Sequence, residues 1–232
     1  RYSPLINRKL SDTRTDPIFK EIRIIAIVRD QRTIIPRGDT YIRNNDHVFF
    51  ISNNKSVNTV KDLVHHKEKE IHDVMIIGGD DLAYSTAREL EDDYGVTLIH
   101  NDKERCKWLA ERLDTALIIH GDYKNINLLI EEGLETMDGF LALTDSSETN
   151  IITSLSAKNH GVYKTIAHVD TREYIHISHS IGVDSLINKK LVAANHVSRY
   201  LKKGQVEAVS GIQGVEAEFV QYAVTKNNKL TK

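Results

Sequence analysis

Disulfide bonds, membrane-spanning segments and an N-terminal export signal are all lacking in this sequence of 232 residues. Cys106 is the single cysteine, so no internal disulfide framework and no cysteine-rich metal site can form. The longest apolar run, residues 24–28, is far shorter than the ~20 apolar residues that a membrane helix needs. The sequence opens with neither a secretory signal nor a methionine, which favours an excised piece of a cytoplasmic protein.

A strong net charge of either sign is lacking as well. Lysine and arginine number 31 and aspartate and glutamate 33, which leaves a net charge of -2 at pH 7. Without an overall basic field the composition argues against a dedicated nucleic-acid binder, and we expect no nucleic-acid partner. Apolar residues make up 40% of the chain and charged residues 28%, values typical of a soluble globular protein.

Residues 1–66 have the pattern of a small module with antiparallel strands. Runs rich in β-branched and aromatic residues alternate there with turn residues, and the runs lie at 22–28, 33–35 and 48–51. Valines at helical spacing follow in residues 56–65. We therefore expect a small α+β module in this part of the chain.

The middle of the chain, residues 71–201, alternates short apolar runs with amphipathic segments. The apolar runs lie at 74–77, 96–99, 116–119, 140–143, 165–169 and 185–187. Helical periodicity follows each run, at 82–94, 103–113, 126–130, 149–160, 173–181 and 191–201. Strands that are apolar throughout are typical of a parallel sheet covered on both faces. Six such repeats predict an α/β domain with a Rossmann-like, doubly wound parallel sheet.

The last part of the chain, residues 205–232, returns to the pattern of the first. We expect strands at 206–209 and 219–224, separated by glycines. This piece is too short to bury a core of its own. It has the pattern of the beginning of a second copy of the first module.

The first strand–turn–helix unit of a Rossmann sheet is where the pyrophosphate of a dinucleotide binds, and its glycine pattern is partial here. Gly78 supplies the turn and Ala83 can replace the third glycine, but Asp80 stands at the position of the second. Asp80 and Asp81 either cap the following helix or bring negative charge to the place of the pyrophosphate. Each carboxylate–phosphate contact at ~4 Å would cost roughly 1 to 4 kcal/mol, depending on the dielectric.

Polar residues also follow the later predicted strands, at the edge where open α/β sheets bind ligands. His100 replaces the acidic residue that binds ribose hydroxyls, and Asp102 is expected to cap the next helix. Asp122 could accept a hydrogen bond from an adenine amino group or a ribose hydroxyl. Residues 144–146 could meet phosphate or cap the helix that follows, and the sequence leaves both readings open.

Four motifs occur in a recognisable order: Ile-Ile-Gly-Gly at 76–79, Gly-Asp at 121–122, Ala-Leu-Thr-Asp-Ser-Ser-Glu-Thr-Asn at 142–150 and Ile-Ala-His-Val at 166–169. This series resembles the RCK, or KTN, domain, the regulatory nucleotide-binding module of potassium channels and transporters. Motifs within residues 27–48 resemble the small C-terminal companion of that module. The order of companion, nucleotide fold and second companion resembles the tandem arrangement of the peripheral regulatory subunits of Trk potassium-uptake systems.

The resemblance implies three parts: an RCK_C-type companion at 1–66, an RCK_N/KTN nucleotide-binding domain at 71–201 and the start of a second companion at 205–232. It implies nucleotide contacts at Gly78, Gly79, Asp80, Asp81, Leu82, His100, Asn101, Asp122, Thr144, Asp145 and His168. It further implies NAD(H) or ADP/ATP as ligand, a membrane potassium transporter subunit as partner, and self-association as a dimer or higher oligomer. The chain would be a non-catalytic, cytoplasmic regulatory subunit, peripheral to the inner face of the cell membrane.

Three of these positions depart from the pattern of the family. Asp80 and His100 replace a glycine and a carboxylate, and His168 stands where the family often has arginine. Neutral imidazole offers little to a phosphate, because its ordinary pKa lies near 6.5. We therefore expect this half to bind adenine nucleotides weakly or not at all, with the residual affinity greater near pH 6.

A Rossmann-type NAD(P)-dependent oxidoreductase is the alternative function. Its short-chain form needs a Tyr-x-x-x-Lys pair, and Tyr222 and Lys226 have that spacing, but they lie in a strand-like run outside the nucleotide fold. No nucleophile elbow or zinc-protease motif occurs in the sequence. Histidines at 65–66, 176 and 179 lack evident converging ligands, so we expect no metal site.

Overall fold

The computed structural model describes residues 5–13, 19, 22–30, 32–52, 69–171, 174, 182–201, 206–211 and 218–222. The chain divides into two compact units, one formed by residues 1–68 with 198–232 and the other by residues 69–197. None of the helices within the described ranges is long and apolar enough to cross a membrane.

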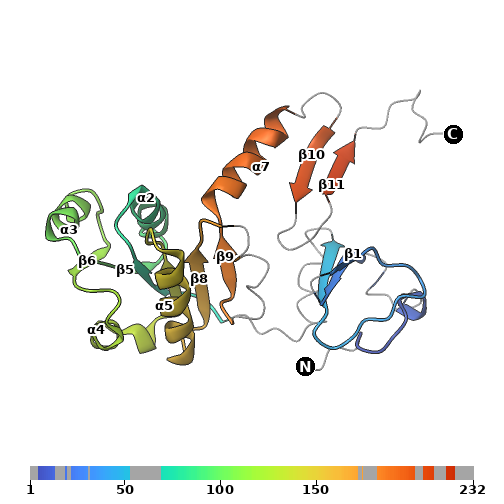
Figure 1. The fold of residues 1–232 in the computed structure, drawn as a ribbon, viewed down its shortest axis with the longest axis horizontal. Helices are drawn as coiled ribbons and strands as arrows, with labels where there is room; N and C mark the ends of the chain where they lie inside the picture. Colours follow the sequence, from blue (N-terminus) through green and yellow to red (C-terminus); the bar gives the residue numbers. More distant parts are fainter. Residues whose placement is uncertain are drawn as a thin grey trace. The chain divides into compact units, whose positions relative to one another are not determined.

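The second unit is built on a six-stranded parallel sheet (Figure 1). Its strands are β4 (Asp73–Ile77), β5 (Gly95–His100), β6 (Leu117–His120), β7 (Gly139–Ala142), β8 (Lys164–His168) and β9 (Ser185–Ile187). The spatial order is β6-β5-β4-β7-β8-β9, and each neighbouring pair is parallel. This is the order 3-2-1-4-5-6 of a doubly wound Rossmann sheet, with the reversal of direction between β4 and β7. The predicted fold class is therefore confirmed.

Helices cover both faces of this sheet. Successive residues of a strand point to opposite faces, so the sheet's apolar strands present apolar side chains on both sides that the helices bury. The helices are α2 (Asp81–Leu90), α3 (Lys103–Ala110), α4 (Ile126–Glu131), α5 (Ser147–Asn159) and α7 (Lys189–Leu201), with a short 3-10 helix η4 (Leu134–Thr136). Val74 and Ile76 of β4 pack in the core beneath α2 and α3. Met75 and Ile77 pack in the core that α4 and α5 cover.

Two of the predicted helices end earlier than their apolar pattern suggested. The helix expected to reach residue 94 ends at Leu90, because residues 91–93 form a turn that leads into β5. The helix expected to reach residue 113 ends at Ala110, and Leu113 still packs in the core from the turn that follows. The helices expected at 56–65 and 173–181 lie outside the described residues, apart from residue 174.

The first unit contains short antiparallel strands, as expected. Strands β1 (Ile22–Arg29), β2 (Arg32–Ile34) and β3 (His47–Ser52) form a sheet in the order β2-β1-β3, preceded by the 3-10 helix η1 (Leu10–Thr13). Leu5, Ile27 and Ile42 form its buried core. Strands β10 (Val206–Gly211) and β11 (Glu218–Tyr222) pair as an antiparallel hairpin.

A bidentate ion pair connects β1 to the turn before β3. Arg29 donates from Nε and Nη2 to the two carboxylate oxygens of Asp46, at 2.8 and 2.7 Å. The N–H of Arg43 donates to the same carboxylate at 2.8 Å. Burial alone would raise the pKa of Asp46, but these donors outweigh it and lower the pKa below its ordinary value. Arg29 and Asp46 both belong to the motifs of residues 27–48 that resemble the companion module, and the ion pair gives these two residues a structural role.

Acidic side chains anchor the loops at the amino edge of the parallel sheet. Asp138 accepts from the N–H of His72 at 2.8 Å and lies 2.7 Å from Nζ of Lys69. Asp184 accepts from the N–H of Thr165 at 2.8 Å. These carboxylates bind N–H groups near the points where strands begin, so they serve the fold at the edge opposite the candidate site.

Replacing Asp138 with asparagine is expected to cost about 1–3 kcal/mol at pH 7, because a charged hydrogen-bond acceptor is lost. Lys69, together with the N–H groups of His72 and Asp73, lowers the pKa of Asp138 to about 2 from 3.8. A lowered folded-state pKa gives stability that is present above pH 3.8 and is lost as the pH falls towards 2. Urea unfolding from pH 7 to pH 3 should therefore show a shallower decline in Asp138→Asn than in the wild type. Exposed Asp92→Asn is the control, and equal slopes in all three chains would contradict the prediction.

Candidate functional site

Two glycines shape the turn that follows β4. Gly78 has a φ of +130°, in the range that side chains rarely adopt. A Cβ at Gly78 would lie 2.5 Å from the carbonyl oxygen of Leu143, and a Cβ at Gly79 would lie 2.6 Å from the ring of His100. The backbones of β4 and of the segment after β7 thus approach closely at the point where the strand order reverses, where Rossmann sheets bind ligands.

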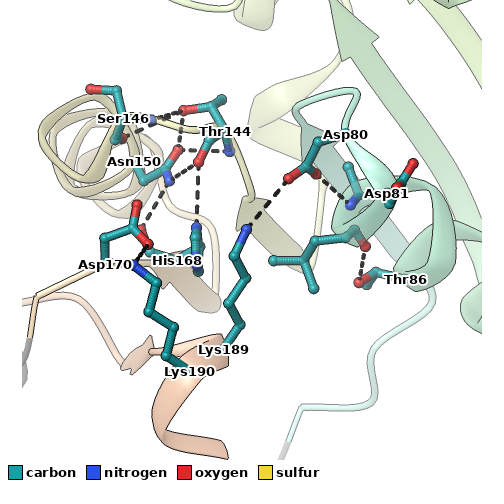
Figure 2. A network of polar contacts seen from close by, with 12 residues as sticks. Asp80, Asp81, Thr86, Thr144, Ser146, Asn150, His168, Asp170, Lys189 and Lys190 are labelled. Carbon is teal, nitrogen blue, oxygen red and sulfur yellow. Dashed lines mark hydrogen bonds and ion pairs between the residues drawn. The ribbon is translucent and has the colours of Figure 1, made fainter. Parts of the chain in front are cut away.

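The two aspartates after the glycines have different roles. Asp80 is the N-cap of α2 and accepts from the N–H of Ala83 through Oδ1 at 3.0 Å. Its second oxygen, Oδ2, lies 3.9 Å from Nζ of Lys189 (Figure 2). Asp81 is the first residue of the helix, is exposed, and lies 3.3 Å from Nη2 of Arg105. The capping role therefore belongs to Asp80 alone, and its carboxylate stays at the helix N-terminus where a pyrophosphate would bind.

The ring of His100, at the end of β5, covers the glycine turn. Its Nδ1 is buried and has no hydrogen-bond partner among the described residues. Burial lowers the pKa of His100 below its ordinary value, which disfavours the charged form of the ring. Tyr123 stacks against it, with ring centroids 6.3 Å apart. Arg105 donates from Nε to the carbonyl oxygen of Gly79 and thereby fixes the turn from the side of α3.

A buried asparagine joins the carboxyl ends of β7 and β8 (Figure 2). Asn150 accepts from the N–H and the hydroxyl of Thr144, at 3.0 and 2.6 Å. Its amide group donates to the carbonyl oxygens of Thr144 and His168, at 2.8 and 2.9 Å. The Thr144 hydroxyl also accepts from the N–H of Ser146 at 3.2 Å. The Thr144 hydroxyl therefore donates its one proton within this network.

Residues 144–146 include the cap of the helix that follows. Ser146 is the N-cap of α5 and accepts from the N–H of Thr149 at 3.1 Å. Asp145 is exposed. Burial raises the pKa of Tyr123, and the negative charges of Asp122 and Asp145 raise it further. Asp102 caps α3, as expected, by accepting from the N–H of Arg105 at 2.6 Å.

The resemblance also implied nucleotide contacts at Asp122, Asn101 and Leu82, which lie in different surroundings. Asp122 is exposed and accepts from the N–H of Lys124 at 3.0 Å. Asn101 is exposed, and its carbonyl oxygen lies 3.1 Å from Nε2 of His120. Leu82 packs its side chain into the core beneath α2.

His168 is almost fully buried at the end of β8. It is 2% exposed, and its Nδ1 lies 3.4 Å from the carbonyl oxygen of Thr144. A carbonyl oxygen accepts only, so this contact favours the tautomer with a proton on Nδ1. Nε2 is then an acceptor, and it is buried without a partner in the described part of the chain. In this tautomer His168 offers a ligand a hydrogen-bond acceptor at Nε2.

Sequence reasoning missed two features of this edge. Asn150 was given no role beyond its place in the motif 142–150 and in the helix that follows, although it holds the two strand ends together. Lys189 opens α7 directly after β9 and extends towards Asp80. The sequence did contain an indication for Lys189. The helix dipole disfavours a lysine in the first turn of a helix, so a lysine at that position indicates a role other than helix stability.

Potential metal ligands do not cluster in the part of the chain that the structure describes. No group of three or more potential metal ligands occurs among those residues. Tyr222 lies in β11, as expected, whereas Lys226 and the histidines at 65–66, 176 and 179 lie outside the described residues. The groups at the carboxyl edge can form hydrogen bonds and ion pairs with a ligand.

Comparison with known families and proteins gives the same architecture. The TrkA-N domain family matches residues 74–189, and the TrkA-C domain family matches residues 2–65. Trk system potassium uptake protein TrkA of Halomonas elongata is 31% identical over 218 residues, which cover 94% of this chain and 48% of that protein. A TrkA homolog of Archaeoglobus fulgidus is 34% identical over 91% of this chain and 48% of its own length. The chain thus spans about half the length of these relatives.

Solved structures agree with the fold. The GsuK RCK domain and the GsuK channel bound to NAD superpose with TM-scores of 0.56 and 0.55, each at 17% identity and over 86% of this chain. The matches cover 43% and 35% of those two chains. With its sheet order, its glycine turn and the match over residues 74–189, the chain belongs to the TrkA-N domain family and carries a TrkA-C domain ahead of the TrkA-N domain.

Proposed function

We propose that this chain is part of a non-catalytic regulatory subunit of a potassium transport system, acting at the inner face of the cell membrane. The observation that carries the proposal is a TrkA-N sheet with a glycine turn at its point of reversal, in a chain whose relatives are named potassium uptake proteins. The groups at that edge suit ligand binding. Their chemistry favours a sensor over an enzyme.

The ligand that we propose is an adenine nucleotide, either NAD(H) or ADP/ATP. The glycine turn gives a phosphate close access to backbone N–H groups at the start of α2. Asp122 is exposed at the end of β6 and can accept from an adenine amino group or a ribose hydroxyl. Asp80 opposes phosphate binding with its own charge, and neutral His100 does not offset it. We therefore propose weak binding in this half of the intact protein.

Regulation would follow if two nucleotide-binding domains pair in either of two arrangements and the nucleotide binds one arrangement more tightly than the other. A ligand shifts such an equilibrium only by its differential affinity for the two states, commonly ~1–3 kcal/mol. A weak site can act in this way if it is occupied at cellular nucleotide concentrations. No covalent chemistry is required of the chain.

Self-association is a further part of the proposal. Val192 and Val197 on α7 are 59% and 57% exposed. The RCK resemblance places pairing on the helices that follow the fifth and sixth strands, and α7 follows β9, the sixth strand of the sheet. We propose that a second copy covers these valines. Sedimentation velocity should give a dimer or a larger oligomer at micromolar concentration, and a monomer would count against this part.

Thermal unfolding in the presence of NADH, ATP or adenosine tests the ligand. A bound ligand raises the unfolding temperature in a concentration-dependent way, and weak binding predicts that the rise begins only at roughly 0.1–1 mM ligand. Steady consumption of NADH with a small-molecule substrate would instead support the oxidoreductase. A submicromolar dissociation constant at pH 8 would contradict weak binding. Co-sedimentation with liposomes containing the cognate potassium-translocating subunit, against empty liposomes, tests the partner.

A further inference from the structure

The start of α7 carries two lysines in a place that disfavours cations. Lys189 and Lys190 occupy the first turn, next to the positive end of the helix dipole. Their backbone position is fixed by Asn188, which accepts from the N–H of Leu191 at 2.9 Å and donates to the carbonyl oxygen of Asp170 at 2.8 Å. Residues that break a local rule in a fixed position often belong to functional sites.

The two lysines differ in what they contact (Figure 2). Lys190 lies 3.4 Å from a carboxylate oxygen of Asp170, close to its own helix. Lys189 extends towards Asp80, which belongs to the turn after β4, three strands away in the sheet order. Nζ of Lys189 is 3.9 Å from Oδ2 of Asp80, which is longer than a hydrogen bond. The ammonium therefore balances the charge of Asp80 without being tightly held.

A second feature of the same edge indicates an unmet hydrogen bond. His168 pairs with Ile187 at the end of β9, two residues before Lys189. Its buried Nε2 lacks a partner among the described residues, although buried polar atoms are nearly always paired. A cation and an orphan acceptor thus lie at the ends of adjacent strands. A ligand with both phosphate oxygens and hydroxyl groups would satisfy them.

We propose that Lys189 is the phosphate-recognising residue of this site, and that Asp80 occupies it as an internal anion until a nucleotide phosphate takes its place. The inference rests on the proposed function, because it assumes that a nucleotide reaches this edge. Binding then exchanges one anion for another at Lys189. The exchange gives a physical reason for weak affinity, since the ligand competes with a carboxylate that is always present.

The test is a double-mutant cycle on the full chain, with dissociation constants from NMR titrations of the 15N-labelled protein. Asp80→Asn removes the charge and keeps the cap, because asparagine is as good an N-cap as aspartate. Asp80→Asn should bind ADP about 10-fold more tightly than the wild type, which corresponds to about 1.4 kcal/mol. Asp80→Asn/Lys189→Ala should lose that gain. Lys190→Ala is the matched control on the same helical turn, and adenosine, which has no phosphate, should bind all chains alike.

The outcomes separate the inference from the function on which it rests. If ADP binds and the gain in Asp80→Asn persists in the double variant, Lys189 is not the phosphate residue and the inference fails alone. Equal ADP affinity in the wild type and Asp80→Asn, or an equal loss in Lys189→Ala and Lys190→Ala, would also overturn it. If neither ADP nor adenosine binds any of these chains, the proposed ligand and the inference both fail.

Discussion

Replacing Asn150 with alanine is expected to destabilise the chain by about 3–5 kcal/mol, because several buried polar groups lose their partner together. The Asn150 side chain is fully buried, with 0% exposure. It holds the N–H, the hydroxyl and the carbonyl oxygen of Thr144 as well as the carbonyl oxygen of His168. Alanine leaves these groups unpaired between the ends of β7 and β8. Urea unfolding at pH 7 measures the loss.

Two further variants sharpen this test. Asn159→Ala changes an exposed asparagine of the same helix and should alter stability by less than about 0.5 kcal/mol. Asn150→Asp keeps an acceptor but loses both donors and buries a charge, so it should be at least as destabilising as Asn150→Ala. A loss below about 1 kcal/mol in Asn150→Ala would show that the network does not hold the strand ends.

Replacing Glu91 with alanine should have an effect of similar size, about 3–4 kcal/mol. Its Oε2 accepts from the N–H groups of Asp114, Thr115 and Ala116, at 2.8, 3.0 and 3.2 Å. Its Oε1 accepts from Arg88 at 2.8 Å. The carboxylate therefore organises the loop before β6. Chemical denaturation of Glu91→Ala measures its contribution, with exposed Glu89→Ala as the matched control.

The pH dependence of the same residue has a definite sign. Burial alone would raise the pKa of Glu91, but the three N–H donors and Arg88 outweigh it and lower the pKa below 4.5. Its contribution is therefore present above pH 4.5 and declines as the pH falls below that value. Glu91→Gln should be less damaging than Glu91→Ala, and its stability should fall less than that of the wild type between pH 5 and pH 3. Identical stability of Glu91→Ala and Glu89→Ala would contradict the assignment.

The sheet could be predicted from the sequence because its determinants are local. Val74 to Ile77 is apolar throughout, and the strands that follow it have apolar residues on both faces, a pattern that belongs to a parallel sheet covered on both faces. The turn at Gly78 could also be predicted, because a glycine directly follows the apolar strand. The structure gives the physical reason, since the close approach of Leu143 leaves no room for a side chain there. Helix ends were less well predicted, because an apolar residue such as Leu113 packs in the core from a turn as well as from a helix.

The candidate site depended on contacts between segments far apart in the chain, which a sequence pattern does not contain. Asp80 could be read as a cap or as a charge opposed to phosphate; one of its oxygens caps α2, and the other faces Lys189, a contact that the sequence did not indicate. Thr144 had the position of a phosphate ligand, but Asn150 takes its hydroxyl. His100 was expected to supply charge near pH 6, but burial against the glycine turn lowers its pKa.

The central claim is that an adenine nucleotide binds weakly at the carboxyl edge of β4, β5 and β6. Titrating the 15N-labelled chain with ADP to about 5 mM detects dissociation constants in the millimolar range, where the binding free energy is about -4 kcal/mol. The amides of Gly78, Gly79 and Gly121 at this edge should shift and saturate. The amides of Gly95 and Gly139 at the amino edge should stay in place. Unchanged spectra, or shifts confined to the amino edge, would contradict the account.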